Sequence, residues 1–274
     1  MDLTSCFTWQ NELCDPSGIR AAKPRKTGLT MVIDKGLGLH AFKDMLQSAA
    51  SHIDLIKIGF GTSPLYPASL LRHKLQLAAE HQICVFPGGT FLEVAVRQQA
   101  VPAFFDNLLQ FGFTGVEISD GTIEMERSLR SRLIRRGSEE GLRVFTEYGK
   151  KLQGSAIELN TLGETVELDL SLGAELVTIE GRESGSGVGI YDTQGECNQE
   201  LVFRILEQIP QSDHLLWEAP NKSGQVQLIK SVGADVSLGN ISPQDVFSLE
   251  ALRRGLRADT FDLGHVEPEL TYEI

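Results

Sequence analysis

Cysteine is scarce in this chain, which has only 4 among its 274 residues. The four are widely spaced and form no Cys-x-x-Cys pair, so neither a disulfide framework nor a thiolate zinc site is expected. The histidines form no His-x-His or His-Glu-x-x-His pattern, which also argues against zinc. No apolar run is long enough to span a bilayer, and Met1 to Ser5 lack a basic segment followed by an apolar core. We therefore expect a soluble, cytoplasmic protein with no membrane partner.

Positive charge is also in short supply. The chain has 25 Lys and Arg against 37 Asp and Glu, a formal charge of -12. Proteins that bind nucleic acid or anionic membranes generally need a basic face, so both classes are disfavoured. An anionic substrate remains compatible with this charge, because a local cluster of Lys and Arg can dominate a pocket inside an acidic shell.

A regular alternation of short apolar runs and amphipathic segments begins near Leu29. Eight runs have the composition of buried β-strands, and a helix-like segment follows each of them. The predicted strands are Thr30–Ile33, Leu55–Ile58, Ile83–Phe86, Gly115–Ile118, Arg143–Thr146, Leu176–Ile179, His214–Trp217 and Asp235–Leu238. The predicted helices are Leu39–Ser51, Pro67–His81, Ala100–Phe111, Ile123–Glu140, Leu159–Leu172, Gln199–Ile209, Lys222–Val232 and Pro243–Gly255.

Strands that recur about every 30 residues with a helix in each gap predict a single α/β domain, a (β/α)8 TIM barrel. A doubly wound open sheet is the main alternative, but no G-x-G-x-x-G turn follows the first predicted strand. The chain also has no P-loop and no serine nucleophile elbow. We place a short N-terminal extension at residues 1–22, the barrel at 23–261 and a C-terminal tail at 262–274.

The carboxyl ends of the predicted strands carry many charged residues. The stretch Thr146–Lys151 is the clearest case, because a carboxylate at Glu147 and paired lysines at Lys150 and Lys151 follow an apolar strand. Charges at the end of a buried strand must be paired, hydrated or used. Since barrel active sites lie at this end of the strands, the charges are expected to form one anion-handling site.

Two further features of these strand ends indicate bound ions. Mg²⁺ prefers oxygen ligands and needs only one or two carboxylates, but spacing alone does not choose among the acidic residues. Glycine turns at Gly88-Gly89 and Gly239-Asn240 expose backbone N–H groups, which suit the binding of a phosphate. The candidate metal ligands are Asp34, Glu117, Glu147, Glu180 and Glu218.

The strand-end motifs, taken together over residues 23–261, resemble the phosphosulfolactate synthase family. Gly181 and Ala258 depart from the pattern that we expect for this family, but neither departure removes a charged group. The segments that carry the resemblance are Lys23–Arg25, Gly28–Gly36, Lys57–Thr62, Phe86–Glu93, Glu117–Gly121, Glu147–Lys151, Glu180–Gly185, Glu218–Pro220, Gly239–Ile241 and Leu252–Thr260.

The resemblance implies an oligomeric TIM barrel that adds sulfite to phosphoenolpyruvate with Mg²⁺, giving 2-phospho-3-sulfolactate. The aci-carboxylate dianion that forms when sulfite adds needs electrostatic stabilisation and then a proton on the adjacent carbon. For the general acid we favour Lys150, with Lys151 left open, and Glu147 and Arg182 act beside it. The groups expected to hold phosphate, carboxylate and sulfite are Arg25, Lys35, Lys57, Gly88, Gly89, Lys151, Arg182, Gly239, Asn240 and Arg257.

Two other functions are compatible with such a barrel. Another enzyme of phosphoenolpyruvate or phosphosugar chemistry would use the same cations and metal, and indifference to sulfite would distinguish it. A non-catalytic, stress-related paralogue is expected to have lost its strand-end charges. Lys150, Glu147 and Arg182 are all present, which argues against that second alternative.

Overall fold

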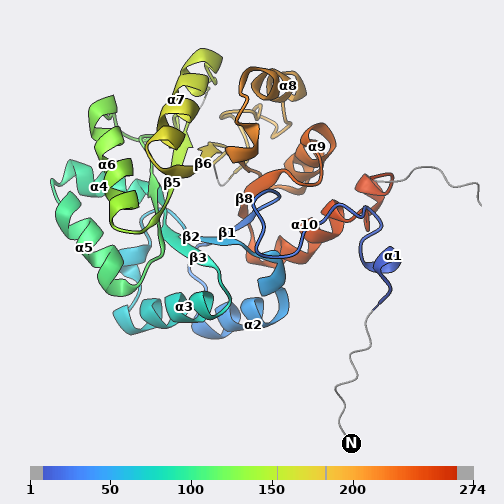
Figure 1. Ribbon diagram of the computed structural model, residues 1–274, viewed down its shortest axis with the longest axis horizontal. Helices are drawn as coiled ribbons and strands as arrows, with labels where there is room; N and C mark the ends of the chain where they lie inside the picture. Colours follow the sequence, from blue (N-terminus) through green and yellow to red (C-terminus); the bar gives the residue numbers. More distant parts are fainter. Residues whose placement is uncertain (1–8, 153, 183, 264–274) are drawn as a thin grey trace, which may run out of the picture.

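Eight parallel strands gather in the middle of the molecule, and helices surround them (Figure 1). This computed structural model describes residues 9–152, 154–182 and 184–263. The predicted (β/α)8 barrel is confirmed. The proposed N-terminal extension is described only from residue 9, and most of the proposed C-terminal tail lies outside the described residues. None of the described helices is long and apolar enough to cross a membrane.

The strands follow the chain in order, and each is succeeded by at least one helix. The strands are β1 (Thr30–Asp34), β2 (Leu55–Ile58), β3 (Cys84–Pro87), β4 (Gly115–Ile118), β5 (Arg143–Tyr148), β6 (Ala174–Ile179), β7 (Leu215–Glu218) and β8 (Ser237–Ile241). The helices are α1 (Asn11–Cys14), α2 (Leu39–Ala49), α3 (Ala68–Glu80), α4 (Gly89–Arg97), α5 (Val101–Phe111), α6 (Arg127–Glu139), α7 (Leu159–Ser171), α8 (Gln199–Gln208), α9 (Lys222–Val232) and α10 (Val246–Arg253).

Pairing of the first strand with the last joins the two halves of the sheet. β1 pairs with β2 on one side and with β8 on the other, as an open doubly wound sheet would not. The strand order runs β3-β2-β1-β8-β7-β6-β5-β4, which leaves a seam between β3 and β4. At this seam Thr114 N donates to Val85 O (3.2 Å) and Val85 N donates to Thr114 Oγ1 (3.1 Å). The barrel is therefore nearly closed.

Alternate residues of each strand face opposite sides of the sheet, and this separates two apolar layers. Inside the barrel lies a small cluster of Leu29, Met31, Leu55, Cys84, Phe86, Phe145, Leu176 and Leu216. The larger cluster lies between the sheet and the helices and includes Val32, Ile56 and Val144. Residues in step with Met31, Leu55 or Phe145 thus point inward, and their successors at the strand ends reach the mouth of the barrel.

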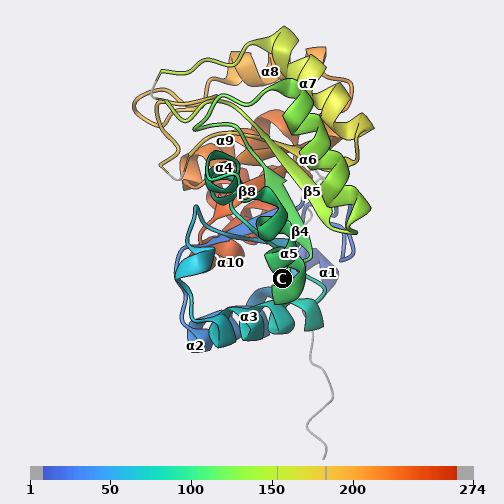
Figure 2. The same cartoon turned by 90° about the vertical axis from the view of Figure 1, so that its left-hand side faces the viewer.

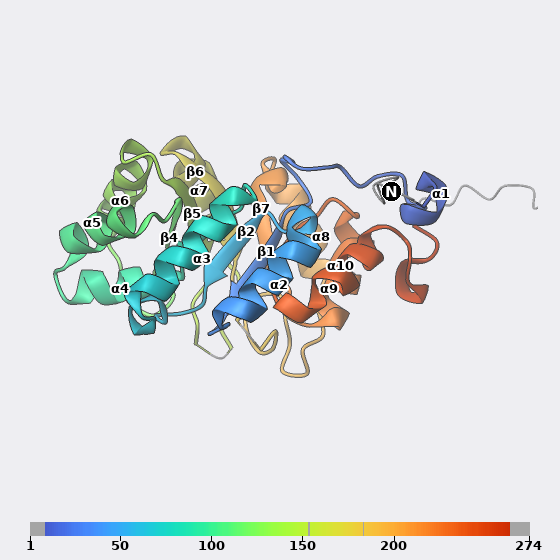
Figure 3. The same cartoon turned by 90° about the horizontal axis from the view of Figure 1, so that it is seen from below.

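The segment before β1 and the last helix lie together at the amino end of the barrel. Arg20 pairs with Glu250 of α10 at 3.0 Å, and Arg25 pairs with Asp54, just before β2, at 2.9 Å. α1 lies at the outer edge beside α10 (Figure 1), while α2 and α3 run side by side in front of the strands (Figure 3). In Figure 2 the loops after β5 and β6 project together on one side, and Gly154 N donates to Gly187 O between them (2.9 Å).

Candidate functional site

A polar cavity of about 180 Å³ opens at the carboxyl ends of the strands. Side chains from seven of the eight strands or the loops directly after them surround it, which is the position of the active site in TIM barrels. It is lined by Ile33, Lys57, Phe60, Gly88, Gly89, Thr90, Glu147, Lys151, Glu180, Arg182, Glu218 and Asn240.

Lys57 forms the floor of this cavity. Its Nζ lies 2.9 Å from Glu117 Oε1, 3.2 Å from Glu218 Oε1 and 3.4 Å from Glu147 Oε2. Burial alone would lower the pKa of Lys57, but the three carboxylates raise it well above its usual value. The ammonium group is therefore permanently charged, and it holds three acidic strand ends in one place.

A second cation, Lys151, lies at the wall of the cavity. Its Nζ is 2.9 Å from Glu147 Oε1 and 3.6 Å from Glu180 Oε2. Burial lowers the pKa of Lys151, but Glu147 and Glu180 outweigh burial and raise it. Burial likewise raises the pKa of Glu147, yet Lys151 and Lys57 hold that carboxyl well below its usual range. Glu147 is thus an ionised bridge between the two lysines.

Glu180 lines the cavity, and one of its oxygens has no hydrogen bond. Oε1 accepts the backbone N–H of Arg182 at 2.6 Å, while the buried Oε2 has no hydrogen-bond partner. Burial raises the pKa of Glu180 to about 10, and the charges of Glu147 and Glu218 act in the same direction. Without a bound cation, this carboxyl group therefore holds a proton at neutral pH.

The glycine turn after β3 allows the backbone to approach the cavity closely. Gly89 N donates to Glu117 Oε2 at 2.5 Å. A Cβ at Gly89 would collide with the Cβ of Ser119 and lie 3.2 Å from the Glu117 carboxylate. Since Gly89 is also the first residue of α4, the turn presents a helix N-terminus to the cavity, where negative charge is favoured.

Three residues of the cavity have left-handed backbone conformations although they are not glycines. They are Phe60 with φ 54°, Arg182 with φ 59° and Asn240 with φ 56°. Such conformations cost free energy in residues with a Cβ, and they cluster at binding and catalytic sites. Asn240 Nδ2 donates to Arg182 O at 3.4 Å, which joins two of the three.

Most of the residues predicted from the sequence meet in this cavity. Lys57, Glu147, Lys151, Glu180 and Glu218 do so because each is in step with the inward-facing positions of its strand or lies in the loop beyond. The glycine turn Gly88-Gly89, Arg182 and Asn240 also line it. Glu117 lies beneath the lining, bound to Lys57, and Gly239 packs against Leu216 and Met31 inside the barrel.

Asp34 is not near these carboxylates, contrary to its prediction as a metal ligand. Ile33 faces the cavity, so the next residue points outward between the strand and the helices. There Asp34 is buried, pairs with Lys74 Nζ and accepts a hydrogen bond from the hydroxyl of Tyr66 at 3.1 Å. It also accepts the N–H groups of Gly36 and Leu37. These partners fix the loop after β1 and use up the acceptor capacity of the carboxylate.

Lys150, the favoured general acid, points away from the cavity. Its Nζ donates to the carbonyl oxygens of Asp120 (2.9 Å) and Ile123 (3.0 Å), and it lies 3.4 Å from the exposed Glu124. Lys150 lines a neighbouring hollow between β5, α6 and α7. The loop after β5 can turn only one of the paired lysines into the barrel, and Lys151 occupies that position.

Three predicted anion ligands also lie outside the cavity. Arg25 binds Asp54 and the carbonyl oxygen of Ser51 at the amino end of the barrel, so it cannot reach the strand carboxyl ends. Arg257 binds Ser248 on the outer layer. Lys35 is exposed after β1 with its aliphatic stem beside Gly59, at the correct end of the barrel but not in the lining.

Four residues of the predicted strand-end motifs were given no role in the site, although they lie in or beside the cavity. Phe60 and Thr90 line the cavity, and Lys151 Nζ lies 3.3 Å from Thr90 Oγ1. Ser119 and Glu93 form a buried polar link behind the cavity wall. The alternation of β4, continued one residue past its end, puts Ser119 on the same side as Glu117. The alternation does not place Glu93 in the site, since the direction of its side chain depends on where α4 begins.

The acidic side chains of the cavity fit a hard cation that takes part of its ligands from a substrate. Within the described ranges, no three His, Cys, Asp or Glu side chains form a group that holds a metal ion alone. Mg²⁺ needs only one or two carboxylates when a phosphorylated substrate supplies further oxygens. The buried, unbonded Oε2 of Glu180 is the kind of group that such an ion satisfies, and Glu218 lines the cavity beside it.

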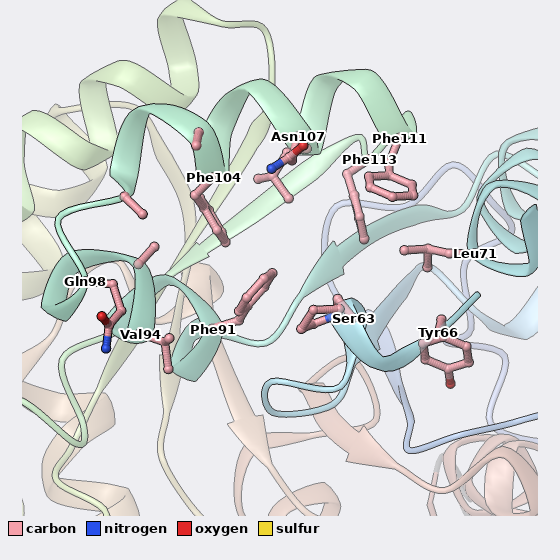
Figure 4. A pocket seen from close by; sticks show the side chains of 15 residues that line it. Ser63, Tyr66, Leu71, Phe91, Val94, Gln98, Phe104, Asn107, Phe111 and Phe113 are labelled. Atoms are coloured by element: carbon pink, nitrogen blue, oxygen red, sulfur yellow. The ribbon is translucent and has the colours of Figure 1, made fainter. Parts of the chain in front are cut away.

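A larger hollow of about 440 Å³ lies outside the barrel, between α3, α4 and α5 (Figure 4). Phe91, Phe104 and Phe113 point into it, and the described residues that line it include no charged side chain. A pocket without cations cannot offset the charge of a phosphate or a sulfite. The smaller polar cavity is therefore the candidate site.

Comparison with known proteins places the chain in an enzyme family. The family model of (2R)-phospho-3-sulfolactate synthase (ComA) matches residues 19–259. Phosphosulfolactate synthase from Methanothermobacter thermautotrophicus is 39% identical over 243 residues, covering 88% of this chain and 94% of the relative. The enzyme of the same name from Bacillus subtilis is 39% identical over 248 residues, covering 89% and 96%.

More distant relatives agree with the fold. Protein HEAT-STRESS-ASSOCIATED 32 from Arabidopsis thaliana is 24% identical over 143 residues, half of each chain. Dihydrodipicolinate synthase from Agrobacterium tumefaciens superposes with a TM-score of 0.53 at 9% identity, covering 86% of this chain and 76% of that one. At such low identity the structural match concerns the barrel alone.

Proposed function

Because the chain belongs to the (2R)-phospho-3-sulfolactate synthase family, we propose that it adds sulfite to phosphoenolpyruvate to give (2R)-2-phospho-3-sulfolactate. This reaction class makes it a carbon–sulfur lyase. The observation that carries the proposal is the cavity at the strand ends, where Lys57, Lys151 and Arg182 meet a buried carboxyl group with an oxygen that has no hydrogen bond. Such a site suits two anionic reactants that must be held together.

The reaction places three demands on the site. The lone pair of sulfite forms a carbon–sulfur bond with the methylene carbon of phosphoenolpyruvate, and the double-bond electrons move toward the carboxylate. A proton then adds to the carbon that bears the phosphate. The site must hold two anions side by side, stabilise the extra charge and deliver the proton.

Cations that stand ready before the substrates bind meet the first two demands. Lys57 and Lys151 are fixed by carboxylates, so their charges need no rearrangement during the reaction. The exposed Arg182 lies at the rim, where a planar guanidinium group can grip a phosphate or carboxylate through two hydrogen bonds. The N-terminus of α4 at Gly89 adds a further anion-favouring group.

Lys151 is our candidate for the proton donor, in place of Lys150. Its ammonium group faces the cavity, and the nearby carboxylates keep it protonated at neutral pH. Transfer of its proton to the carbon is aided when the bound substrates reduce the influence of Glu147 on the ammonium group. Glu147 then serves to aim the Lys151 ammonium group.

We propose Mg²⁺ as the cofactor, held by Glu180 with Glu218 beside it. When bound, Mg²⁺ supplies a Lewis acid that stabilises negative charge on the substrate carboxylate. Glu180 would hold the ion through Oε2, the oxygen that has no hydrogen bond, and would have to lose its proton to do so. We also propose that the chain assembles into a homo-oligomer, as the family resemblance implies. Sedimentation analysis measures the number of subunits and tests this.

The test is product formation from phosphoenolpyruvate, sulfite and Mg²⁺, with each component omitted in turn. A sulfonated phosphoester that requires all three supports the proposal. Lys151→Ala is the matched site variant and is expected to lose the product. No product from the folded wild type with all three components present would contradict the proposed reaction.

A further inference from the structure

Glu93 is a buried carboxylate of α4 that the proposed reaction does not use directly. Its side chain is 2% exposed and does not line the cavity. Both hydrogen bonds that the structure gives it come from neutral donors. Ser119 Oγ lies 2.6 Å from Oε1, and the backbone N–H of Thr122 donates to Oε2 at 2.9 Å. A buried carboxylate held only by neutral donors is costly, so its presence calls for a role beyond packing.

Ser119 links Glu93 to Glu147 at the cavity wall through hydrogen bonds. The same Oγ lies 2.8 Å from Glu147 Oε1, the oxygen that also binds Lys151 at 2.9 Å. A hydroxyl group has one proton, so it donates to only one of its two carboxylate neighbours at a time. The orientation of this hydroxyl therefore decides how firmly the carboxylate of Glu147 is held toward Lys151.

Glu93 also holds the loop against which Lys151 packs. It fixes both ends of residues 119–122 through Ser119 and Thr122. Within that loop, Gly121 O accepts the backbone N–H of Lys151 at 3.1 Å. The stem of Lys151 lies so close that a Cβ at Gly121 would be 3.1 Å from it. One carboxylate thus restrains Lys151 at two points, its backbone and its ammonium group.

We propose that Glu93 is a positioning residue that acts through Ser119 to aim the Glu147–Lys151 pair into the cavity. The proposal rests on the proposed function, in which Lys151 delivers the proton. Because Glu93 does not touch the cavity, it affects the reaction step more than substrate binding. Residues that orient a catalytic group in this way typically contribute about 10- to 100-fold to activity.

The test is steady-state kinetics of Glu93→Ala, Glu93→Gln and Ser119→Ala with the three reaction components. We expect kcat to fall about 10- to 100-fold in Glu93→Ala and Ser119→Ala, while KM for phosphoenolpyruvate stays within about threefold. Glu93→Gln is expected to restore kcat to within about threefold of wild type. Its amide N–H donates to Ser119 Oγ, and its carbonyl oxygen accepts from Thr122.

Two controls separate positioning from loss of stability. Glu250→Ala removes another buried carboxylate at the opposite end of the barrel, so it is expected to lower the melting temperature but not kcat. The double variant Glu93→Ala/Ser119→Ala is expected to be no slower than the worse single variant, because both act on one path. Fully multiplicative losses would overturn the proposal.

The wild type is assayed first, so that two failures are distinguishable. No product from wild type overturns the proposed function. Product from wild type, with normal kcat in both Glu93→Ala and Ser119→Ala, overturns the positioning role alone. A loss of kcat in Glu93→Gln as large as in Glu93→Ala also overturns it, since glutamine makes a hydrogen bond at both positions, with the direction of the Ser119 bond reversed.

Discussion

Lys150 and Lys151 are neighbours in the chain, yet their ammonium groups lie in different hollows. Lys151 Nζ is 2.9 Å from Glu147 Oε1 inside the barrel mouth, whereas Lys150 Nζ binds the carbonyl oxygen of Asp120 at 2.9 Å. The two residues have the same charge and nearly the same sequence position. Only the direction of each side chain distinguishes a group that can reach substrate from one that fixes a loop.

This difference predicts unequal effects of the two alanine substitutions. Lys151→Ala is expected to lower kcat by at least about 100-fold, because it removes the proposed proton donor. Lys150→Ala is expected to stay within about fivefold, since it loses hydrogen bonds to loop carbonyls and ion pairs outside the cavity. Steady-state kinetics measures both, and circular dichroism checks that each variant is folded. The reverse order of effects would return the general-acid role to Lys150.

The buried carboxyl group of Glu180 predicts how stability depends on pH. Its pKa is raised to about 10, so above its usual pKa of 4.5 the folded protein keeps a proton that the unfolded chain has released. The free energy of unfolding therefore falls as pH rises through this window, by at most about 1.4 kcal/mol per pH unit. In Glu180→Gln the side chain at this position cannot titrate. As the pH rises from about 6 to about 9, the melting temperature of this variant is therefore expected to increase relative to that of wild type.

The same comparison of melting temperatures tests whether Mg²⁺ binds at Glu180. In the proposed site Mg²⁺ would replace the proton on Glu180, so it is expected to raise the melting temperature of wild type, and more so at higher pH. Glu180→Gln is expected to lose this response. Glu207→Gln, on the exposed face of α8, is the matched control and is expected to behave as wild type. An equal response to Mg²⁺ in Glu180→Gln would exclude Glu180 as a ligand.

The crowded surroundings of Gly89 predict that adding a single methyl group there lowers the free energy of unfolding. In Gly89→Ala the new Cβ collides with Ser119, so the free energy of unfolding is expected to fall by about 1–3 kcal/mol. Turnover is expected to fall as well, because the collision displaces the anion-binding turn. Gly163→Ala is the control. It has open space around it within α7, and is expected to gain about 0.5–1 kcal/mol. Urea denaturation measures both changes.

Arg182 allows its side chain and backbone to be tested separately. Glycine adopts the observed φ of 59° without strain, whereas the wild-type arginine and alanine both have a Cβ and both lose about 1–2 kcal/mol to it. Both Arg182→Gly and Arg182→Ala are expected to raise KM for phosphoenolpyruvate about 10-fold, because each loses a charge-assisted hydrogen bond. Only the glycine variant is expected to gain stability, because alanine keeps the backbone strain of the wild-type arginine. An unchanged KM in both variants would remove Arg182 from the substrate-binding groups.

The sequence predicts the fold well, because hydrophobic periodicity reflects the two sides of each strand. β2 and β4 have the predicted bounds, and so does α9. α4 was not predicted as a separate helix. It is divided from α5 by a turn in which Gln99 has φ 56°, and glutamine gives no sign of such a conformation in a sequence.

The site is predicted only where strand alternation continues to the strand end. Lys57, Glu180 and Glu218 are in step with inward-facing residues and do meet in the cavity. The same counting excludes Asp34, which follows the inward-facing Ile33. Beyond the last strand residue the alternation stops, so no rule of spacing decides between Lys150 and Lys151. That choice depends on tertiary contacts with the loop at Gly121.

The pairing of β1 with β8 also sets the moment in synthesis at which the chain can finish folding. Leu29 N bonds to Ser237 Oγ across 208 residues, and Arg20 bonds to Glu250 across 230. A ribosome must release nearly the whole barrel before the first strand finds its second neighbour. Until then both edges of the growing sheet are open to other chains. Premature termination before β8 therefore leaves a product prone to aggregation, not a smaller working enzyme.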